Sequence, residues 1–560
     1  LSSDPGGVGR GTAARGTIDN STGWTRVLAS RDDDGERRTP RGDQTGGNGE
    51  RPPVARIGVW PGLGIFSGFV GHRFLQADSA DASSPWRVEQ RGLEPVPVNE
   101  RSATVTDVMW LWMAANIGVF TFGVGAQLAQ LGLAVWQVVI VAIGGAVGSF
   151  AFVALIGLAG PAAGTPTLLA SRATFGVRGN LGPIAVAWLV LVGFEVAMST
   201  TAAFTVAEVA QSLGLPAVGL PFTVPLVVVL VAGAAVIAYF GHATILWIQK
   251  WLGWALAAFT VIVCVIALTT VDWSAAMAAP AGSFAAMMAG IAIVATIGGV
   301  NWLAVGADYT RYLPEDTPKL KLAGFTVLGA SAPLVILTTS GSILTLGNVM
   351  AFGGSASAVG LALPDWLLVP YLVVAFLGMF TAADLAMYSS GLTLQTAGVP
   401  LSRPKVSLIN AGVVAVVSAI IVAIRTTGDP LGADVFSALV GVLLIPLVAW
   451  VGVFGLDLLL HRNLLSKDLN LTGEDSEYWF HRGFHWPAVS AWLFGIVAGL
   501  LCARVQVGDQ EWFVGPLANT WIGWNSLGWW VAGIGAAAAY WVLEPLVDHR
   551  SIPGRVQLDD

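Results

Sequence analysis

The chain has 560 residues, of which 55% are hydrophobic and 11% are charged, and its formal net charge is −7. Soluble globular proteins carry roughly 25% charged residues, so this composition excludes an ordinary soluble domain and indicates a polytopic membrane protein. Charged residues of both signs are concentrated in the two ends of the chain, and we expect no nucleic-acid partner.

The first hundred residues differ in kind from the rest. The stretch RDDDGERRTPRGDQTGGNGERPP (31–53) is charged and rich in glycine and proline. Such a composition buries too little apolar surface to offset the entropy that ordering would remove. We therefore predict that residues 1–100 form a disordered cytoplasmic tail.

Long stretches without Asp, Glu, Lys or Arg follow, such as 108–171, 273–307 and 322–364. A transmembrane helix needs about 20 predominantly apolar residues, and on this basis the sequence predicts about twelve spans. We place them at 105–130, 133–158, 182–211, 222–241, 248–271, 283–305, 321–346, 367–396, 406–426, 432–456, 484–505 and 521–545.

The loop charges predict the orientation of these spans. If the N-terminus is cytoplasmic, most Lys and Arg residues fall in inside segments, and the outside segments hold only Arg425 and Arg504. This bias follows the positive-inside rule. We expect a multi-pass protein of the cell membrane with both termini in the cytoplasm.

Among the ionisable residues of the predicted spans, three are the candidates at bilayer depth: Glu195 and Glu208 in the third span and Asp384 in the eighth. Asp107 and Asp434 lie near span starts, where water is accessible. A charge at bilayer depth is costly, so each of the three is a candidate functional residue. Structural polar pairing between helices is the alternative, and for Glu208 it is the favoured one. Glu195 and Asp384 lie nearer mid-span and are candidates for carrying a proton.

Helix-breaking residues interrupt two spans. In the first span, Asn116 is followed by Gly118, and in the sixth span Gly298 and Gly299 precede Asn301 and Trp302. Glycines also serve close helix packing. However, broken helices at matching positions of two halves, here five spans apart, are typical of a transporter binding site.

A planar ligand would suit such a site. It could stack on Trp302 or Phe194, and its ring nitrogens could bond to Asn116, Glu195 or Asp384.

The stretch WLAVGADYTRYLP (302–314) holds a conspicuous acid and base, Asp308 and Arg311. Both lie past the predicted end of the sixth span, on the cytoplasmic side, where a charged side chain stays hydrated and its desolvation cost is small. We predict that they form a cytoplasmic gate, through ion pairs that break when the site opens inward.

Five stretches resemble the nucleobase:cation symporter-1 family, specifically its bacterial purine–cytosine permease branch. They are VEQRGLEPVPVNER (88–101), WLWMAANIGVFTFGVGA (110–126), SRATFGVRGNLGP (171–183), GVNWLAVGADYTRYLP (299–314) and ADLAMYSSGLTLQTAG (383–398).

The resemblance implies an all-α polytopic fold of the LeuT-like kind, with two inverted five-helix repeats followed by two extra helices. The transporter core would occupy 101–456, a cytoplasmic loop and two additional spans 457–545, and a cytoplasmic tail 546–560.

The resemblance also implies where solutes bind. Carried over by motif, the substrate site would comprise Asn116, Phe194, Glu195, Asn301, Trp302 and Asp384. In the eighth span, Ala383, Leu385 and Ala386 flank Asp384 where the cytosine-type pattern has asparagines. This loss of amide groups argues against cytosine itself as the substrate.

The family's Na⁺ site uses carbonyls of the first span and hydroxyls of the eighth. Here Ala115, Asn116 and Thr381 match it, and no other metal or cofactor is implied. Since Thr381 is the single clear hydroxyl at that place in the eighth span, coupling to H⁺ through Glu195 or Asp384 stays open beside Na⁺.

We therefore predict a secondary active transporter that imports a nucleobase or related heterocycle (purine, cytosine, uracil or allantoin-like) by symport with H⁺ or Na⁺, using alternating access. A symporter of another small solute, such as an amino acid or vitamin, is the alternative. An integral membrane enzyme is disfavoured, because the spans lack clustered acids or histidines at their ends. A channel would need a repeated pore motif, and none is visible.

Overall fold

The structure is a computed structural model that describes residues 85–118, 120–215, 219–349, 363–426, 430–460, 466–507 and 510–546. Most of the predicted N-terminal tail, residues 1–84, and most of the C-terminal tail, residues 547–560, lie outside the described residues.

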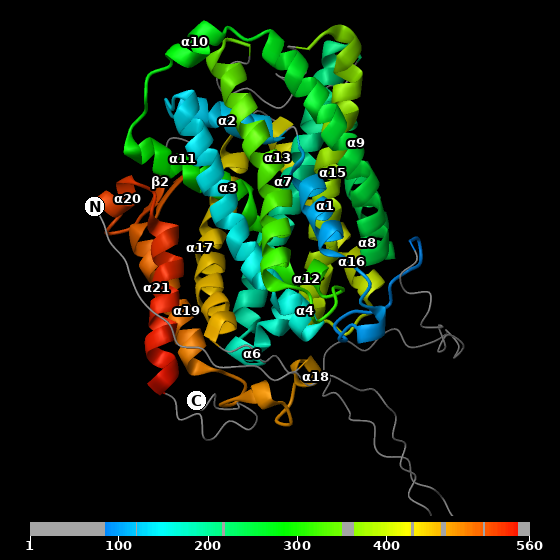
Figure 1. The fold of residues 1–560 in the computed structure, drawn as a ribbon, viewed down its shortest axis with the longest axis vertical. Helices are drawn as coiled ribbons and strands as arrows, with labels where there is room; N and C mark the ends of the chain where they lie inside the picture. Colours follow the sequence, from blue (N-terminus) through cyan, green and yellow to red (C-terminus); the bar gives the residue numbers. More distant parts are fainter. Residues whose placement is uncertain are drawn as a thin grey trace, which may run out of the picture. The chain divides into compact units, whose positions relative to one another are not determined.

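The described chain is almost entirely helical (Figure 1). Its first part contains α1 (Val105–Asn116), α2 (Phe120–Gln130), α3 (Val135–Gly157), α4 (Ala159–Ala163), α5 (Thr167–Ala170), α6 (Arg172–Phe175), α7 (Leu181–Ser212), α8 (Leu220–Phe240), α9 (His242–Thr269) and α10 (Trp273–Ala278). The second part contains α11 (Phe284–Ile297), η3 (Gly299–Val305), α12 (Gly306–Thr310), α13 (Lys319–Leu346), α15 (Asp365–Thr396), α16 (Arg403–Thr426), α17 (Pro430–Leu460), α18 (Ser466–Leu469), α19 (Trp486–Cys502), α20 (Trp521–Trp524) and α21 (Gly528–Leu543).

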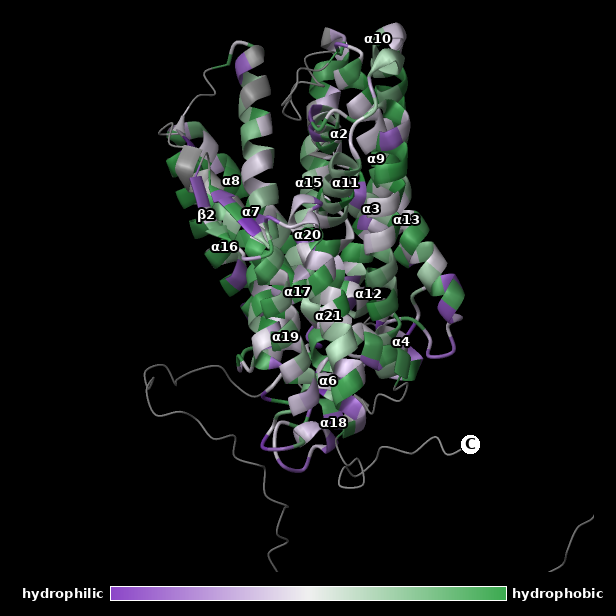
Figure 2. Ribbon diagram, turned by 90° about the vertical axis from the view of Figure 1, so that its left-hand side faces the viewer, coloured by the Kyte–Doolittle hydropathy of each residue, from purple (hydrophilic) through white to green (hydrophobic). Residues whose placement is uncertain are grey.

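Within the described ranges, nine helices are long and apolar enough to cross a membrane, and the bent pair α1 and α2 would make a tenth. Hydrophobic residues run along the long helices, and hydrophilic ones gather around α18 and in β2 (Figure 2). This distribution fits helices that lie in a bilayer, where each backbone polar group is satisfied within its own helix.

The last two predicted spans correspond to shorter helices, α19 with 17 residues and α21 with 16. At 1.5 Å per residue they are about 25 Å long. They pack against each other and against α17, and a small antiparallel hairpin, β1 (Arg504–Val507) and β2 (Gln510–Val514), follows α19.

Both predicted helix breaks are confirmed. α1 ends at Asn116, and the axis of α2 is turned from it by 58°. α11 ends at Ile297, after which η3 continues as a 3₁₀-helix from Gly299. Short 3₁₀ stretches inside a span often mark functional hinges.

Residues 85–104, which we call the lead-in segment, begin inside the stretch predicted to be disordered. The backbone N–H of Glu89 donates to Phe240 O at 2.8 Å, and that of Val96 donates to Gly164 O at 2.9 Å. Val96 is also buried. The segment is therefore attached to the lower ends of the helices in Figure 1, near α4 and α12. Local composition could not reveal these long-range contacts.

Candidate functional site

The break in the sixth span brings η3 against α3. The Gly299 N–H, freed from the helix, donates to the Ser149 hydroxyl at 3.0 Å. A Cβ at Gly299 would lie 2.7 Å from Phe150 N, closer than real Cβ contacts allow. The glycine is thus required by this close approach, and it fixes the positions of Asn301 and Trp302, both of which are buried.

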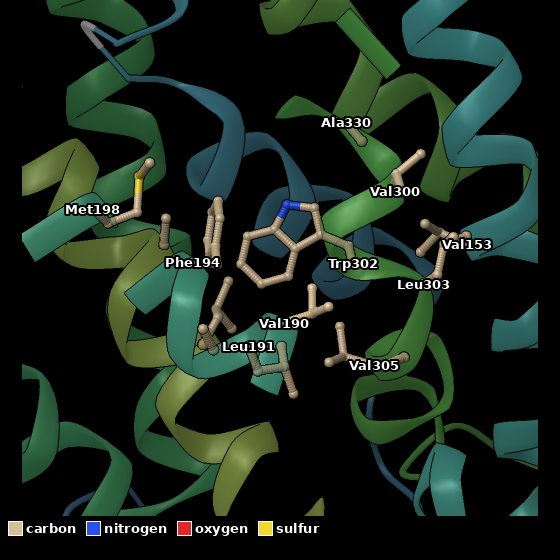
Figure 3. Close-up of a cluster of buried hydrophobic side chains, with 14 of the residues drawn as sticks. Val153, Val190, Leu191, Phe194, Met198, Val300, Trp302, Leu303, Val305 and Ala330 are labelled. Carbon is tan, nitrogen blue, oxygen red and sulfur yellow. The ribbon is translucent and has the colours of Figure 1, made fainter. Parts of the chain in front are cut away.

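Trp302 lies at the centre of an aromatic cluster. Its ring centroid is 5.1 Å from that of Phe194 on α7 and 5.5 Å from that of Trp112 on α1, in both cases edge-on. Figure 3 shows the indole of Trp302 between Phe194 and Met198 on one side and Val300 on the other. The structure therefore brings together two residues predicted for substrate binding, Phe194 and Trp302.

Trp112 was not among the predicted site residues. Its ring touches both Trp302 and Tyr309, and its Nε1 is buried without a hydrogen-bond partner among the described residues. The signal available in the sequence was its position, one helical turn before Asn116 in the broken first span. Asn116 donates from Nδ2 to Trp112 O at 2.8 Å.

The end of α1 meets α15 at Thr381. The Thr381 hydroxyl donates to Gly378 O at 2.7 Å and lies 3.2 Å from Ala114 O. The carbonyl that approaches Thr381 thus belongs to the residue before the predicted pair, Ala115 and Asn116. Hydroxyl and backbone carbonyl oxygens are ligands suited to a hard cation.

Asp384 lies one helical turn after Thr381, and both are fully buried. The amide of Gln249 on α9 donates to Asp384 Oδ1 at 3.0 Å and to Thr381 O at 2.9 Å. Asp384 Oδ2 has no hydrogen-bond partner in the described part of the chain. Gln249 thus links the predicted proton carrier to the predicted cation site, and no sequence pattern marked it.

Glu195 is fully buried but turns toward α16, although it follows Phe194 directly. Its Oε2 accepts from Asn410 Nδ2 at 2.9 Å, and Asn410 Oδ1 in turn accepts from Trp188 Nε1 at 3.0 Å. This pairing between helices corresponds to the structural alternative considered above. The side chain of Glu208 lies outside the described residues.

Asp308 and Arg311 have different partners. Asp308 Oδ1 accepts from both the backbone N–H and the hydroxyl of Thr167, each at 2.8 Å, at the start of α5. Arg311 is fully buried and lies 3.3 Å from Glu89 of the lead-in segment. The acid that faces Arg311 therefore comes from a segment more than two hundred residues away in the sequence.

Comparison with known proteins identifies the family. The family model described as "Permease for cytosine/purines, uracil, thiamine, allantoin" matches residues 95–532. YxlA of Bacillus subtilis (strain 168), named as a purine-cytosine permease, is 27% identical over 330 residues, which cover 57% of this chain and 68% of YxlA. The purine-cytosine permease FCY2 of Saccharomyces cerevisiae is 24% identical, over 58% of this chain and 63% of its own length.

Solved structures with the same fold include Mhp1, a nucleobase-cation-symport-1 family transporter, in a closed conformation with bromovinylhydantoin bound. It is 17% identical with a TM-score of 0.62, and the match covers 82% of this chain and 96% of Mhp1. A Na⁺-coupled sialic acid symporter, 13% identical, has a TM-score of 0.56 over 83% of this chain and 93% of its own.

These likenesses establish the LeuT-like fold, with two inverted five-helix repeats and two further helices. The chain belongs to the nucleobase:cation symporter-1 family of permeases for cytosine/purines, uracil, thiamine and allantoin, and it is a cation-coupled membrane transporter rather than an enzyme.

Proposed function

We propose that this transporter imports a planar nucleobase-like heterocycle, which stacks on Trp302 beside the break in the sixth span. The observation that carries the proposal is the pair of adjacent aromatic residues, Trp302 and Phe194, at the unwound segment η3. Base-like rings stack on aromatic faces whatever their substituents, and the unwound backbone offers polar groups that a continuous helix would not.

Binding would move the two rings. A planar ligand sandwiched between two aromatic faces needs them about 7 Å apart, since each contact takes about 3.5 Å. The rings of Trp302 and Phe194 now touch edge-on at 5.1 Å. We propose that substrate enters as these rings turn and separate. Asn116, Asn301 and Trp112 Nε1, which has no hydrogen-bond partner in the described ranges, would then bond to its edge.

We propose H⁺ as the coupling ion, with Asp384 as its carrier. Asp384 is fully buried, no Lys or Arg within the described residues forms an ion pair with it, and one of its oxygens has no hydrogen-bond partner there. A buried carboxyl in such surroundings favours its neutral, protonated form. Gln249 links Asp384 to Thr381, which lies against the end of α1. Protonation of Asp384 would therefore change the hydrogen bonds next to the first helix break.

Binding of Na⁺ by Thr381 with carbonyls of Ala115 and Asn116 is the alternative. The Thr381 hydroxyl already lies near Ala114 O, so this junction could close around a cation. Substrate uptake driven by a Na⁺ gradient, without any effect of a pH gradient, would favour it over Asp384.

We propose that the protein lies in the cell membrane with both termini in the cytoplasm. The lead-in segment, α4, α6 and α12 share the lower end in Figure 1. Three arginines belong to this end: Arg311 and Arg403 pair with Glu89 of the lead-in segment, and Arg172 of α6 donates to Thr396 O at the end of α15. The positive-inside rule assigns such an end to the cytoplasm.

The direct test is uptake by cells that express the protein, using radiolabelled cytosine, adenine, uracil and allantoin. We expect accumulation of at least one of these compounds, faster at acidic external pH. Competition only by an amino acid or a vitamin would instead support the alternative solute class.

A further inference from the structure

The lead-in segment carries an acid that lies among buried cations. Glu89 Oε1 is 3.3 Å from Arg311 Nη2, and Glu89 Oε2 is 3.4 Å from Arg403 Nε. Both guanidinium groups have no exposed side-chain surface, whereas Glu89 is 15% exposed. One carboxylate therefore faces two fully buried positive charges.

Neutral donors complete the surroundings of Glu89. The backbone N–H of His242, at the start of α9, donates to Oε2 at 2.8 Å. The hydroxyls of Tyr312 and Tyr388 both reach Oε1, that of Tyr388 at 3.3 Å. Burial acts to raise the pKa of Glu89, but the charges of Arg403 and Arg311 outweigh it and hold that pKa below its ordinary value.

The partners of Glu89 come from four different parts of the fold. His242 begins α9, Arg311 follows α12, Tyr388 lies on α15 and Arg403 begins α16. In the inverted-repeat architecture these elements belong to different spans, and they move relative to one another when a transporter changes its open side. Contacts between them are therefore contacts that an opening would break.

A chain of aromatic rings links these residues to the candidate substrate site. Tyr309 joins the two places, since its ring is 5.9 Å from that of Tyr388 and 6.0 Å from that of Trp112. The Tyr309 hydroxyl donates to Leu385 O at 2.6 Å and lies 3.0 Å from the Ser389 hydroxyl. A solute leaving Trp302 toward this end would pass these rings and then reach Glu89.

We propose that Glu89 is the counter-charge that closes the cytoplasmic exit, and that opening to the cytoplasm requires it to separate from Arg311 and Arg403. Loss of the carboxylate leaves two buried cations that repel each other, which favours the open state. The proposal rests on the transporter function and on the proposed orientation, but on neither the identity of the solute nor that of the coupling ion.

The test measures access to the exit without any substrate. Ser389 is fully buried, directly follows Tyr388 and lies against the Tyr309 hydroxyl, so Ser389→Cys, with Cys264→Ala and Cys502→Ala, gives a single reporter thiol. In nanodiscs both faces of the protein are accessible to a water-soluble maleimide. We expect Glu89→Gln to raise the labelling rate at least about tenfold over the parent.

Glu100→Gln is the matched control. Glu100 belongs to the same segment, has the same 15% exposure and pairs with Arg91 at 2.8 Å. It should label at the parent rate. A parent-like rate for Glu89→Gln, in protein that elutes as a single species, overturns the proposal, as does an equal increase for Glu100→Gln.

If Glu89→Gln does not fold, Glu89→Asp serves instead. It keeps the charge but shortens the side chain by one methylene, so we expect a smaller increase in labelling. An unchanged rate in Glu89→Asp, together with unchanged labelling in Tyr388→Phe, would equally overturn the proposal. Because no solute is used, failure of this test and failure of the nucleobase proposal are distinguishable.

Discussion

The indole of Trp302 is the side chain on which the proposed recognition depends. Trp302→Ala should raise the apparent substrate constant, since base stacking contributes about 1–3 kcal/mol. The maximal rate should change less, because the helix break itself remains. Trp251→Ala on the exposed surface of α9 is the control. Wild-type affinity in Trp302→Ala would remove this residue from the site.

The carboxyl of Asp384 is tested by separating exchange from accumulation. Asp384→Asn cannot release a proton, so it should exchange substrate across the membrane yet fail to accumulate it against a gradient when external pH is lowered. Glu195→Gln, which alters the other predicted proton carrier, should keep proton-driven accumulation. Retention of the pH effect in Asp384→Asn would refute the assigned role.

Residue types in the sequence were sufficient to predict Trp302, Phe194 and Asp384 as candidates, because a polar or aromatic residue stands out in an apolar span. Thr381 became a candidate only through the resemblance to the family. Their partners were not predictable. Gln249, Asn410 and Glu89 act through contacts more than one hundred residues away in sequence, and although Glu89 lies in a stretch that resembles the family, no local pattern identifies the partners of any of the three.

At the scale of elements, the contact between η3 and α3 holds the broken span in place. Gly299→Ala should disturb it, because the added methyl group would collide with the backbone of Ser149 and Phe150. We expect a loss of about 1–3 kcal/mol in stability and reduced transport. Gly324→Ala on α13, where a Cβ meets nothing within 4 Å, should be neutral. Melting temperatures of the two purified variants compare them, and equal values would contradict this account.

The two breaks were predictable because glycine and asparagine act locally on helix geometry. The lead-in segment was not, because its order depends on hydrogen bonds to α8 and to the loop after α4. α19 and α21 are also shorter than the predicted spans, and for α21 the difference lies mostly at the start, where the separate helix α20 takes up the first residues of the predicted span.

For the whole molecule, proposed recognition and coupling both adjoin the end of α1, through Trp112 and Ala114, and proposed closure lies at the end that we assign to the cytoplasm. Trp302 and Phe194 lie at the unwound sixth span, and Asp384 and Thr381 adjoin the first. Glu89, Arg311 and Arg403 lie at the lower end. Alternating access would then consist of opening the Glu89 contacts while the outward path from Trp302 stays closed.

The most direct measurement is counterflow in proteoliposomes that contain the purified protein. Vesicles preloaded with one compound from a panel of nucleobases, allantoin and hydantoins are diluted into its radiolabelled form, with and without Na⁺. We predict that at least one heterocycle is exchanged without Na⁺ and that Trp302→Ala weakens this exchange. Absence of exchange for every heterocycle, in protein that exchanges an amino acid or a vitamin, would contradict the central claim.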